Sequence, residues 1–221
     1  MGGLGSESGT SIDNRAPRTE PLVVRQLARG FGRRMIFDSI DIALSRGERL
    51  AVRGPNGSGK TTLLRCVAGT LSPSAGEIRI ETYPAGSIEA RRRVGVSLAH
   101  ERSFYMRLTG MENLRFFAHL RFGSLRQATV AVHAVVSELE IEEIAAQRVD
   151  RCSTGMVQQL SFARALLGAP ILLVLDEPTR SLDEGAVDRF WRAIERRPET
   201  AVLMATHSDD DAARCNAQFD L

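Results

Sequence analysis

Residues 54–61 read Gly-Pro-Asn-Gly-Ser-Gly-Lys-Thr, a glycine-rich turn of the form G-x-x-x-x-G-K-T. The apolar stretch from Arg49 to Val52 precedes it and is expected to be a strand, and the stretch from Thr62 to Ala68 is expected to begin a helix. Glycines let the backbone curl so that successive N–H groups point at one centre, and a helix N-terminus adds partial positive charge there. This context favours a phosphate-binding loop over a chance glycine-rich turn.

Two side chains of this loop carry chemistry of their own. The Lys60 ammonium can reach the β- and γ-phosphates of a nucleotide, and the Thr61 hydroxyl can ligate Mg²⁺. The other residues that we expect around the phosphates are Gly54, Pro55, Asn56, Gly57, Ser58, Gly59 and Thr62.

A second stretch supplies two carboxylates. The apolar run from Ile171 to Leu175 ends in Asp176 and Glu177, as expected for a parallel strand buried on both faces. The acids then emerge at the carboxyl end of the strand, where ligands bind in open α/β sheets. We expect Asp176 to hold Mg²⁺, directly or through water, and Glu177 to polarise a water for attack on the γ-phosphate. A helix N-cap is the alternative for either acid alone.

Composition limits the class of protein. The 221 residues predict one domain with room for a subdomain, and the net charge of +2 with interspersed signs shows no nucleic-acid footprint. The three cysteines, Cys66, Cys152 and Cys215, fit neither a zinc site nor a disulfide framework, so we expect a reducing cytoplasm. No apolar run approaches the roughly 18 residues that span a bilayer, so any membrane segment is expected on another subunit.

The remaining pattern predicts an α/β fold. Residues 1–20 lack periodicity and are expected to be a disordered arm, followed by one domain over 21–221. Apolar residues fall at helical spacing from Met111 to about Ala146, which predicts a helical region inserted between two halves of the core. Another helix is expected from Gln158 to Leu167. Further strands are expected at residues 22–24, 40–44, 77–80, 94–98 and 201–205.

Several motifs in this order resemble the nucleotide-binding subunit of ATP-binding-cassette (ABC) transporters, from about residue 22 onward. Residues 54–61 are similar to the phosphate loop of the family, and 152–156, Cys-Ser-Thr-Gly-Met, resemble its signature, usually Leu-Ser-Gly-Gly-Gln. Asp176-Glu177 resembles the metal-binding aspartate and catalytic glutamate, 181–183 the D-loop, and His207 the switch histidine. The resemblance implies a P-loop NTPase (RecA-like) core, a small antiparallel β region and a helical subdomain at about 100–160.

The resemblance also implies how two chains meet. Ser153 and Gly155 are expected to face the γ-phosphate bound to an opposite subunit, so that two chains enclose two ATP molecules head to tail. Taken alone, these residues read as a helix N-cap. His207 is expected to contact the γ-phosphate, with a buried core histidine as the alternative. Asp183 is expected to be a cross-subunit contact, with a helix cap as the alternative.

The chain departs from the family pattern in three places. Thr154 and Met156 change the signature to a form that looks like that of exporters. His100 stands where the family has its Q-loop glutamine; a neutral imidazole can accept a hydrogen bond from a metal-bound water, and Glu101 or a water is the alternative. Phe31 stands where an aromatic, commonly tyrosine, stacks on adenine, with an ordinary core position as the alternative.

The resemblance implies an ATPase that uses ATP and Mg²⁺ to drive export through a separate polytopic permease. We expect a homodimer, or a pair with another ABC subunit, on the cytoplasmic face of the inner membrane, and no nucleic acid. The segment from Arg107 to Leu114 resembles the exporter pattern in the region that faces the permease. One alternative is a soluble ABC clamp of translation or DNA repair, but such proteins usually carry tandem cassettes or long insertions. Another is a P-loop kinase, which leaves the signature unexplained.

Overall fold

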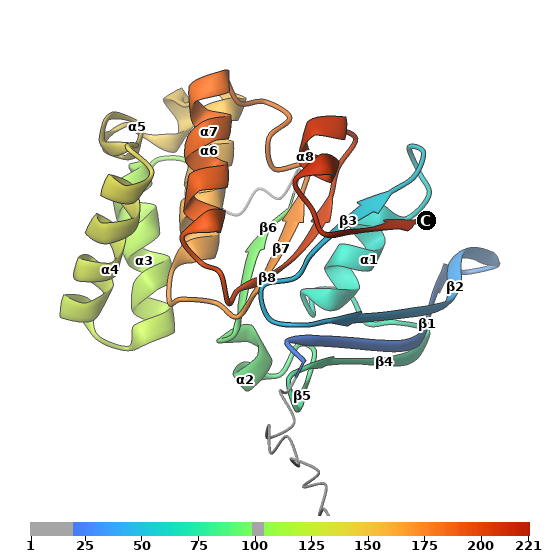
Figure 1. The fold of residues 1–221 in the computed structure, drawn as a ribbon. Helices are drawn as coiled ribbons and strands as arrows, with labels where there is room; N and C mark the ends of the chain where they lie inside the picture. The colour runs from blue at the N-terminus through green and yellow to red at the C-terminus, as the bar shows by residue number, and fades with distance from the viewer. Residues whose placement is uncertain (1–19, 99–103) are drawn as a thin grey trace, which may run out of the picture.

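The computed structural model of the protein describes residues 20–98 and 104–221. A parallel sheet occupies the centre, with an antiparallel sheet on one side and a group of helices on the other (Figure 1). This arrangement confirms the predicted fold class. Residues 1–19 of the expected arm at 1–20, and the candidates His100 and Glu101, lie outside the described residues.

The parallel sheet has the strand order β6-β7-β8-β3-β9, and every neighbouring pair runs parallel. Every residue of β7 and β8 is buried, which explains their continuous apolar sequence. The strands are β3 (Arg49–Arg53), β6 (Val94–Ser97), β7 (Leu172–Asp176), β8 (Ala201–Ala205) and β9 (Ala217–Asp220).

The antiparallel sheet has the order β2-β1-β4-β5, and its buried residues share one core with α1 (Lys60–Val67) and the parallel sheet. Alternate residues at the end of β2 are buried and exposed, as expected for a sheet with one solvated face. The strands are β1 (Leu22–Phe31), β2 (Arg34–Leu44), β4 (Ala75–Ile80) and β5 (Tyr83–Pro84), and the short helix α2 (Ile88–Arg91) follows.

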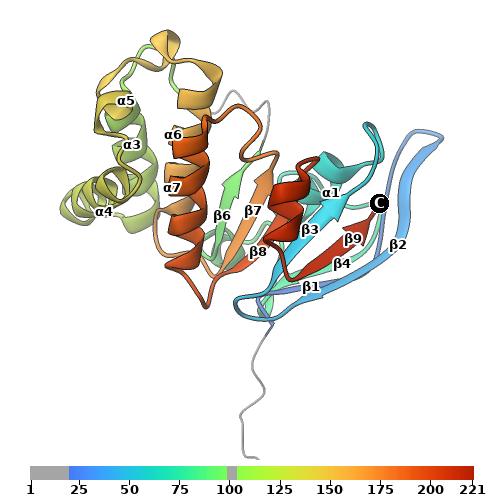
Figure 2. The ribbon, with the colours of Figure 1, turned by 45° about the horizontal axis from the view of Figure 1, so that its top comes forward.

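The helical region forms the second core. Helices α6 (Thr154–Leu166) and α7 (Glu184–Glu195) lie between the parallel sheet and the outer helices, as Figures 1 and 2 both show. The outer helices are α3 (Gly110–Phe122), α4 (Leu125–Glu138) and α5 (Glu142–Ala146), followed by the 3-10 turn η1 (Val149–Arg151). Their buried side chains pack with those of α6, α7, β7 and β8.

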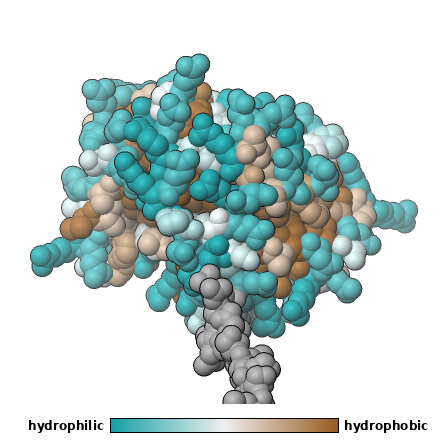
Figure 3. Space-filling model, in the orientation of Figure 1, coloured by the Kyte–Doolittle hydropathy of each residue, from teal (hydrophilic) through white to brown (hydrophobic). Residues whose placement is uncertain are grey.

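The surface is polar over most of the face in Figure 3, with hydrophobic residues showing on the left over α3 and α4 and over a broader area to the right of centre. Four apolar side chains of these two helices are exposed, namely Phe116, Leu120, Leu125 and Val130. None of the helices in the described residues has the length and apolar character needed to cross a membrane.

The structure differs from the predicted elements in several places. Helix α6 begins at Thr154 rather than Gln158, because Ser153 caps it. Strand β9 was not predicted: it is only four residues long, and its place is set by pairing with β3, far away in sequence. The last helix, α8 (Asp209–Ala213), begins after Ser208, whose hydroxyl caps it.

Candidate active site

The carboxyl edge of the parallel sheet brings the candidate residues together. Strands β3, β7 and β8 are adjacent and parallel, so the segments that follow them leave the sheet at the same edge. The phosphate loop follows β3, Asp176 ends β7, and His207 comes shortly after β8. Residues more than one hundred positions apart in sequence thus meet at one edge.

The phosphate loop has the open backbone that a phosphate requires. Gly54, Gly57 and Gly59 have φ angles of 140°, 82° and 115°, a region that side chains other than glycine rarely adopt. Gly59 is the N-cap of α1 and provides no side chain to bond the first N–H groups of the helix. The buried hydroxyl of Ser58 also has no hydrogen-bond partner among the described residues. These unused donors fit an anion with several oxygens.

Lys60 is almost buried, with 7% of its surface exposed. Its Nζ donates to the carbonyl oxygens of Gly54, at 2.7 Å, and Pro55, at 3.0 Å. An ammonium group has three donors, so one N–H remains for a phosphate oxygen bound in the loop.

Thr61 and Asp176 meet although they lie on different elements. The Thr61 hydroxyl donates to Asp176 Oδ2 over 2.8 Å, and only 2% of Asp176 is exposed. A hydroxyl and a carboxylate suit Mg²⁺, which is commonly held by one or two protein oxygens together with waters and substrate phosphates. No cluster of three His, Cys, Asp or Glu side chains in the described chain could hold a metal alone. The residues therefore fit a metal that is completed by phosphate oxygens.

Glu177 and His207 form a second pair at this edge. His207 Nε2 lies 3.4 Å from Glu177 Oε1, and the His207 backbone N–H donates to Glu177 Oε2 over 3.3 Å. Glu177 itself has a φ of 48°, and its N–H donates to the carbonyl of Ala205 over 2.9 Å. The His207 side chain is 45% exposed, so the alternative of a buried core histidine is wrong. The Glu177 carboxylate is oriented from two directions at an accessible edge.

The signature residues lie elsewhere, at the start of α6. The Ser153 hydroxyl accepts from the Met156 N–H over 3.2 Å, so Ser153 acts as the N-cap of this helix. A Cβ on Gly155 would lie 2.3 Å from the carbonyl oxygen of Ser181, which explains why glycine is needed within this chain. The signature therefore packs against the D-loop of its own chain, a contact that the sequence did not predict.

Asp183 and Phe31 occupy surface positions. Asp183 Oδ1 accepts from the Ala186 N–H over 2.8 Å, so it caps α7 while remaining exposed. Phe31 is 49% exposed at the end of β1, and the Arg29 guanidinium lies 4.3 Å from its ring centre. The ordinary-core alternative for Phe31 is therefore wrong.

The exporter-like segment before α3 has local structural roles. Thr109 and Glu112 form a reciprocal capping box at the start of α3. The fully buried Asn113 amide donates to the carbonyls of Tyr105, at 3.0 Å, and Thr109, at 2.9 Å. Part of the sequence signal in this segment thus comes from a helix start.

The three cysteines are free thiols, as their spacing predicted. Burial raises the pKa of Cys66 and of Cys215 to about 11. Burial, assisted by the nearby Asp150 carboxylate, also raises the pKa of Cys152, which lies next to the signature. All three thiols are therefore poor nucleophiles at neutral pH.

Comparisons with known proteins agree with this geometry. The model of the ABC transporter family matches residues 37–180. "Nod factor export ATP-binding protein I" of Rhizobium meliloti (strain 1021) is 31% identical, over 94% of this chain and 64% of that protein. An uncharacterized ABC transporter ATP-binding protein of Bacillus subtilis (strain 168) is 35% identical, over 85% of this chain and 62% of its own length. The chain spans less than two thirds of these relatives.

Solved structures show the same architecture. The ATP-binding subunit of an ABC transporter superposes with a TM-score of 0.80 at 27% identity, covering 90% of this chain and 85% of that one. A dimeric ATP-binding cassette, described in a post-hydrolysis state with ADP and Pi, shares the fold with a TM-score of 0.82 at 20% identity. The match covers 90% of this chain and 94% of that one. The chain therefore belongs to the ABC transporter family, as an ATP-binding domain.

Proposed function

We propose that this chain binds and hydrolyses ATP to drive export through a separate membrane permease. The observation that carries the proposal is the convergence of Lys60, Thr61, Asp176 and Glu177 at one edge of the sheet. These side chains supply a cation that binds the phosphates, two metal ligands and a base. Phosphoryl transfer from ATP to water requires this set.

The phosphate loop would bind ATP through its backbone N–H groups, the Ser58 hydroxyl and the remaining donor of Lys60. Thr61 and Asp176 would hold Mg²⁺, which neutralises charge on the phosphate oxygens when it is bound. Phe31 offers an exposed ring for the adenine at the end of β1.

Glu177 would act as the general base. Its carboxylate takes a proton from water while the water oxygen attacks the γ-phosphorus, and the bond to the β-phosphate oxygen breaks to release ADP and phosphate. His207, 3.4 Å from Glu177, lies where it can contact the γ-phosphate. Within the part of the chain not described, His100 or Glu101 would supply the Q-loop contact to a metal-bound water.

The working unit would be a head-to-tail dimer, either of this chain or with another ABC subunit. Ser153 and Gly155 provide a hydroxyl and a backbone N–H at the start of α6. Such donors suit the phosphate of a second chain. The exposed Asp183 would take part in the same interface.

The permease would bind near the start of α3. Tyr105, Met106 and Leu108 are exposed apolar residues there, and the Tyr105 ring lies 5.0 Å from that of Phe116. Grouped exposed apolar residues commonly mark a protein contact. The chain would then sit on the cytoplasmic face of the inner membrane. Export is favoured over import because several relatives are named as export proteins. The permease would choose the substrate.

The decisive measurement is nucleotide binding and hydrolysis by the purified chain. Lys60→Ala should abolish ATP binding, because it removes the cation that faces the phosphates. Arg65→Ala is the matched control, since Arg65 is an exposed cation on the same helix. Equal ATP affinity in Lys60→Ala and the wild type would contradict the proposal.

Co-purification with a polytopic membrane protein tests the transport role. Co-purification with ribosomes or DNA instead would support the clamp alternative.

A further inference from the structure

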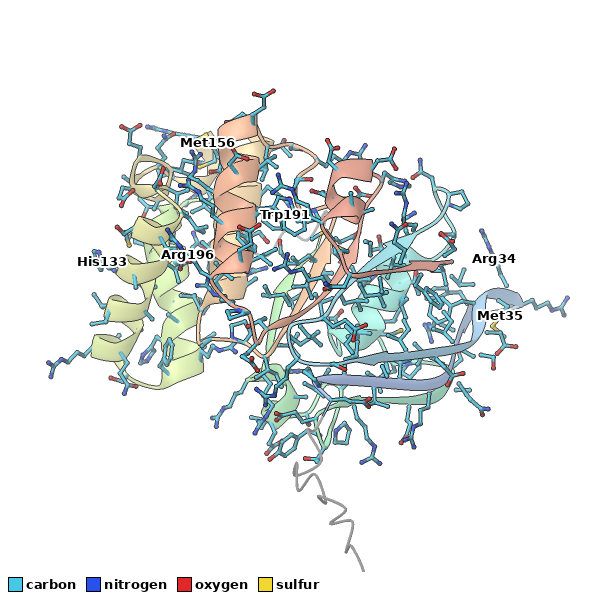
Figure 4. The ribbon with its side chains drawn as sticks, viewed as in Figure 1. Arg34, Met35, His133, Met156, Trp191 and Arg196 are labelled. Atoms are coloured by element: carbon cyan, nitrogen blue, oxygen red, sulfur yellow. The ribbon has the colours of Figure 1, made fainter. Side chains whose placement is uncertain are left out.

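A buried carboxylate behind the catalytic edge has no role in the chemistry above. Asp211 lies on α8 with only 2% of its surface exposed. Trp191 Nε1 donates to its Oδ1 over 3.0 Å, and the hydroxyls of Thr179 and Thr206 donate to its Oδ2 over 2.5 and 3.3 Å. Figure 4 shows Trp191 on the side of α7 that faces α8.

The two threonines belong to the segments that carry the catalytic pair. Thr179 comes two residues after Glu177, and Thr206 comes directly before His207. Both segments leave the sheet at the carboxyl ends of β7 and β8. A single oxygen, Asp211 Oδ2, therefore ties the Glu177 segment to the His207 segment.

The same network fixes the backbone on both sides of His207. The Thr206 hydroxyl accepts from the Ser208 N–H over 3.0 Å, and the Ser208 hydroxyl accepts from the Asp211 N–H over 3.2 Å. Thr206, Ser208 and Asp211 thus form a closed set of hydrogen bonds around one short turn. This turn sets the position of the His207 N–H, which donates to Glu177 Oε2.

Glu177 needs such support, because its φ of 48° lies in the left-handed region. A residue other than glycine stays there only when its surroundings hold it. The Ala205 carbonyl holds the Glu177 N–H, and the bond from Thr179 to Asp211 fixes the chain just after it. The strained residue is held on both sides.

A carboxylate is the group that this position requires. All three side-chain donors are neutral, and a carboxylate accepts at both oxygens, whereas an amide would turn an NH₂ group toward one set of donors. Its negative charge also reaches Cys215, whose pKa is raised by burial first and by Asp211 second. Burying a charge is costly without such hydrogen bonds, so the network is expected to be rigid when it is complete.

We propose that Asp211 is a positioning residue that holds Glu177 and His207 in register for hydrolysis, through Thr179 and Thr206. This inference rests on the proposed ATPase function. It assigns different roles to the two carboxylate oxygens. Oδ2 serves the catalytic edge, and Oδ1, bonded to Trp191, serves the packing of α7 against α8.

The first test compares Asp211→Asn with Trp191→Phe. Asp211→Asn should lower kcat on the order of 10- to 100-fold, because small misplacements of reacting groups carry that cost, and should leave ATP affinity unchanged. Trp191→Phe removes the donor at Oδ1 alone and should keep kcat near that of the wild type while lowering Tm. Equal losses of kcat in both variants, or none in Asp211→Asn, would overturn the proposal.

The second test needs no ATPase activity, so it separates this proposal from the proposed function. In ¹⁵N-labelled protein, the His207 amide proton should move upfield in Asp211→Asn, because its bond to Glu177 loosens, and should stay in place in Trp191→Phe. An unmoved resonance in Asp211→Asn would overturn the positioning role even if the wild type proved inactive. If Asp211→Asn does not fold, Thr206→Val replaces it, with Thr206→Ser restoring the hydroxyl and the resonance.

A third measurement locates the effect. If Asp211 acts through the catalytic base, Asp211→Asn should not lower kcat further in a Glu177→Gln background. The effects of residues that act as one unit are not additive. Full additivity of the two losses would show that Asp211 acts on some other step, and the proposal would be wrong.

Discussion

The carboxyl edge of the parallel sheet and the start of α6 contain the two groups of motif residues, and they are built differently. At the sheet edge, side chains that end or follow three strands converge, with Thr61 bonded to Asp176 over 2.8 Å and His207 3.4 Å from Glu177. At the start of α6, the Ser153 hydroxyl bonds a backbone N–H of its own helix, and Gly155 lies against the Ser181 carbonyl. The first region holds acids and a cation, while the second offers only neutral donors.

The difference shows which region can act within one chain. The sheet edge contains the proposed base, Glu177, and the proposed metal ligands, Thr61 and Asp176. The pairing of the parallel strands sets their positions. The start of α6 has no group that could move a proton, so its chemistry requires a phosphate from elsewhere. The head-to-tail dimer is the proposal that gives this second region a ligand.

The largest expected effect comes from breaking the sheet edge. Glu177→Gln should slow ATP hydrolysis by about 10²-fold or more, the range for a lost general base, while ATP still binds. The variant should accumulate as an ATP-bound dimer on size exclusion. The control is Glu195→Gln, an exposed acid on α7 that should hydrolyse ATP at the wild-type rate. Wild-type turnover in Glu177→Gln would show that another group is the base.

The sheet edge could be predicted from sequence for a physical reason. The run before Asp176 is apolar because β7 is buried on both faces, and the glycines of the phosphate loop are required by its backbone. Both signals are local in sequence, so they can be recognised without knowledge of the fold. The same kind of signal predicted the bounds of β8 and, to within one residue, those of β3.

Other features depend on contacts between distant residues, which a single sequence does not display. Strand β9 exists because it pairs with β3, and the need for Gly155 comes from Ser181. Asp211 is one of three consecutive acids in the first turn of α8, and only the fold shows that it is buried among Thr179, Thr206 and Trp191. The roles expected for His100 and Glu101 stay predictions.

The next largest effect separates the two roles of Ser153. Ser153→Asp keeps an N-cap, so Tm should not change, but it places a negative charge where the partner's phosphate is expected. Hydrolysis should fall roughly tenfold or more, the scale of about 1.4 kcal/mol of like-charge repulsion. Ser124→Asp makes the same exchange at the cap of α4 and should change neither quantity. Full activity in Ser153→Asp would restrict Ser153 to capping.

A smaller effect tests the packing of the signature on the D-loop. Gly155→Ala places a Cβ 2.3 Å from the Ser181 carbonyl oxygen, so the backbone must shift, at a cost of about 1–3 kcal/mol in free energy of unfolding. Gly185→Ala is the matched control, because its Cβ would meet nothing closer than 3.4 Å within α7. That control should lose no stability, because alanine favours a helix more than glycine does. Urea denaturation measures both, and equal stability in the two variants would contradict the close contact.

The smallest effect concerns the thiol beside the signature. The reactive form is the thiolate, and the raised pKa of Cys152 lowers its population at any given pH, so alkylation at pH 7.5 should be slower than in the unfolded chain and should rise with pH. Cys66 and Cys215, with pKa values of about 11, should react more slowly still.

Asp150→Asn removes the anion that helps to raise the pKa of Cys152, so it should speed alkylation by a factor of a few, an effect that salt weakens. Asp188→Asn removes an exposed acid on α7 and should leave the rate unchanged. If two chains meet at the start of α6, ATP should slow the labelling of Cys152 in Glu177→Gln, where the dimer persists, and should leave Cys66 and Cys215 unaffected. Mass spectrometry of each cysteine peptide measures these rates. Identical Cys152 labelling with and without ATP would place the dimer interface away from the signature. The head-to-tail dimer would then no longer explain why the start of α6 offers neutral donors without a ligand of its own chain.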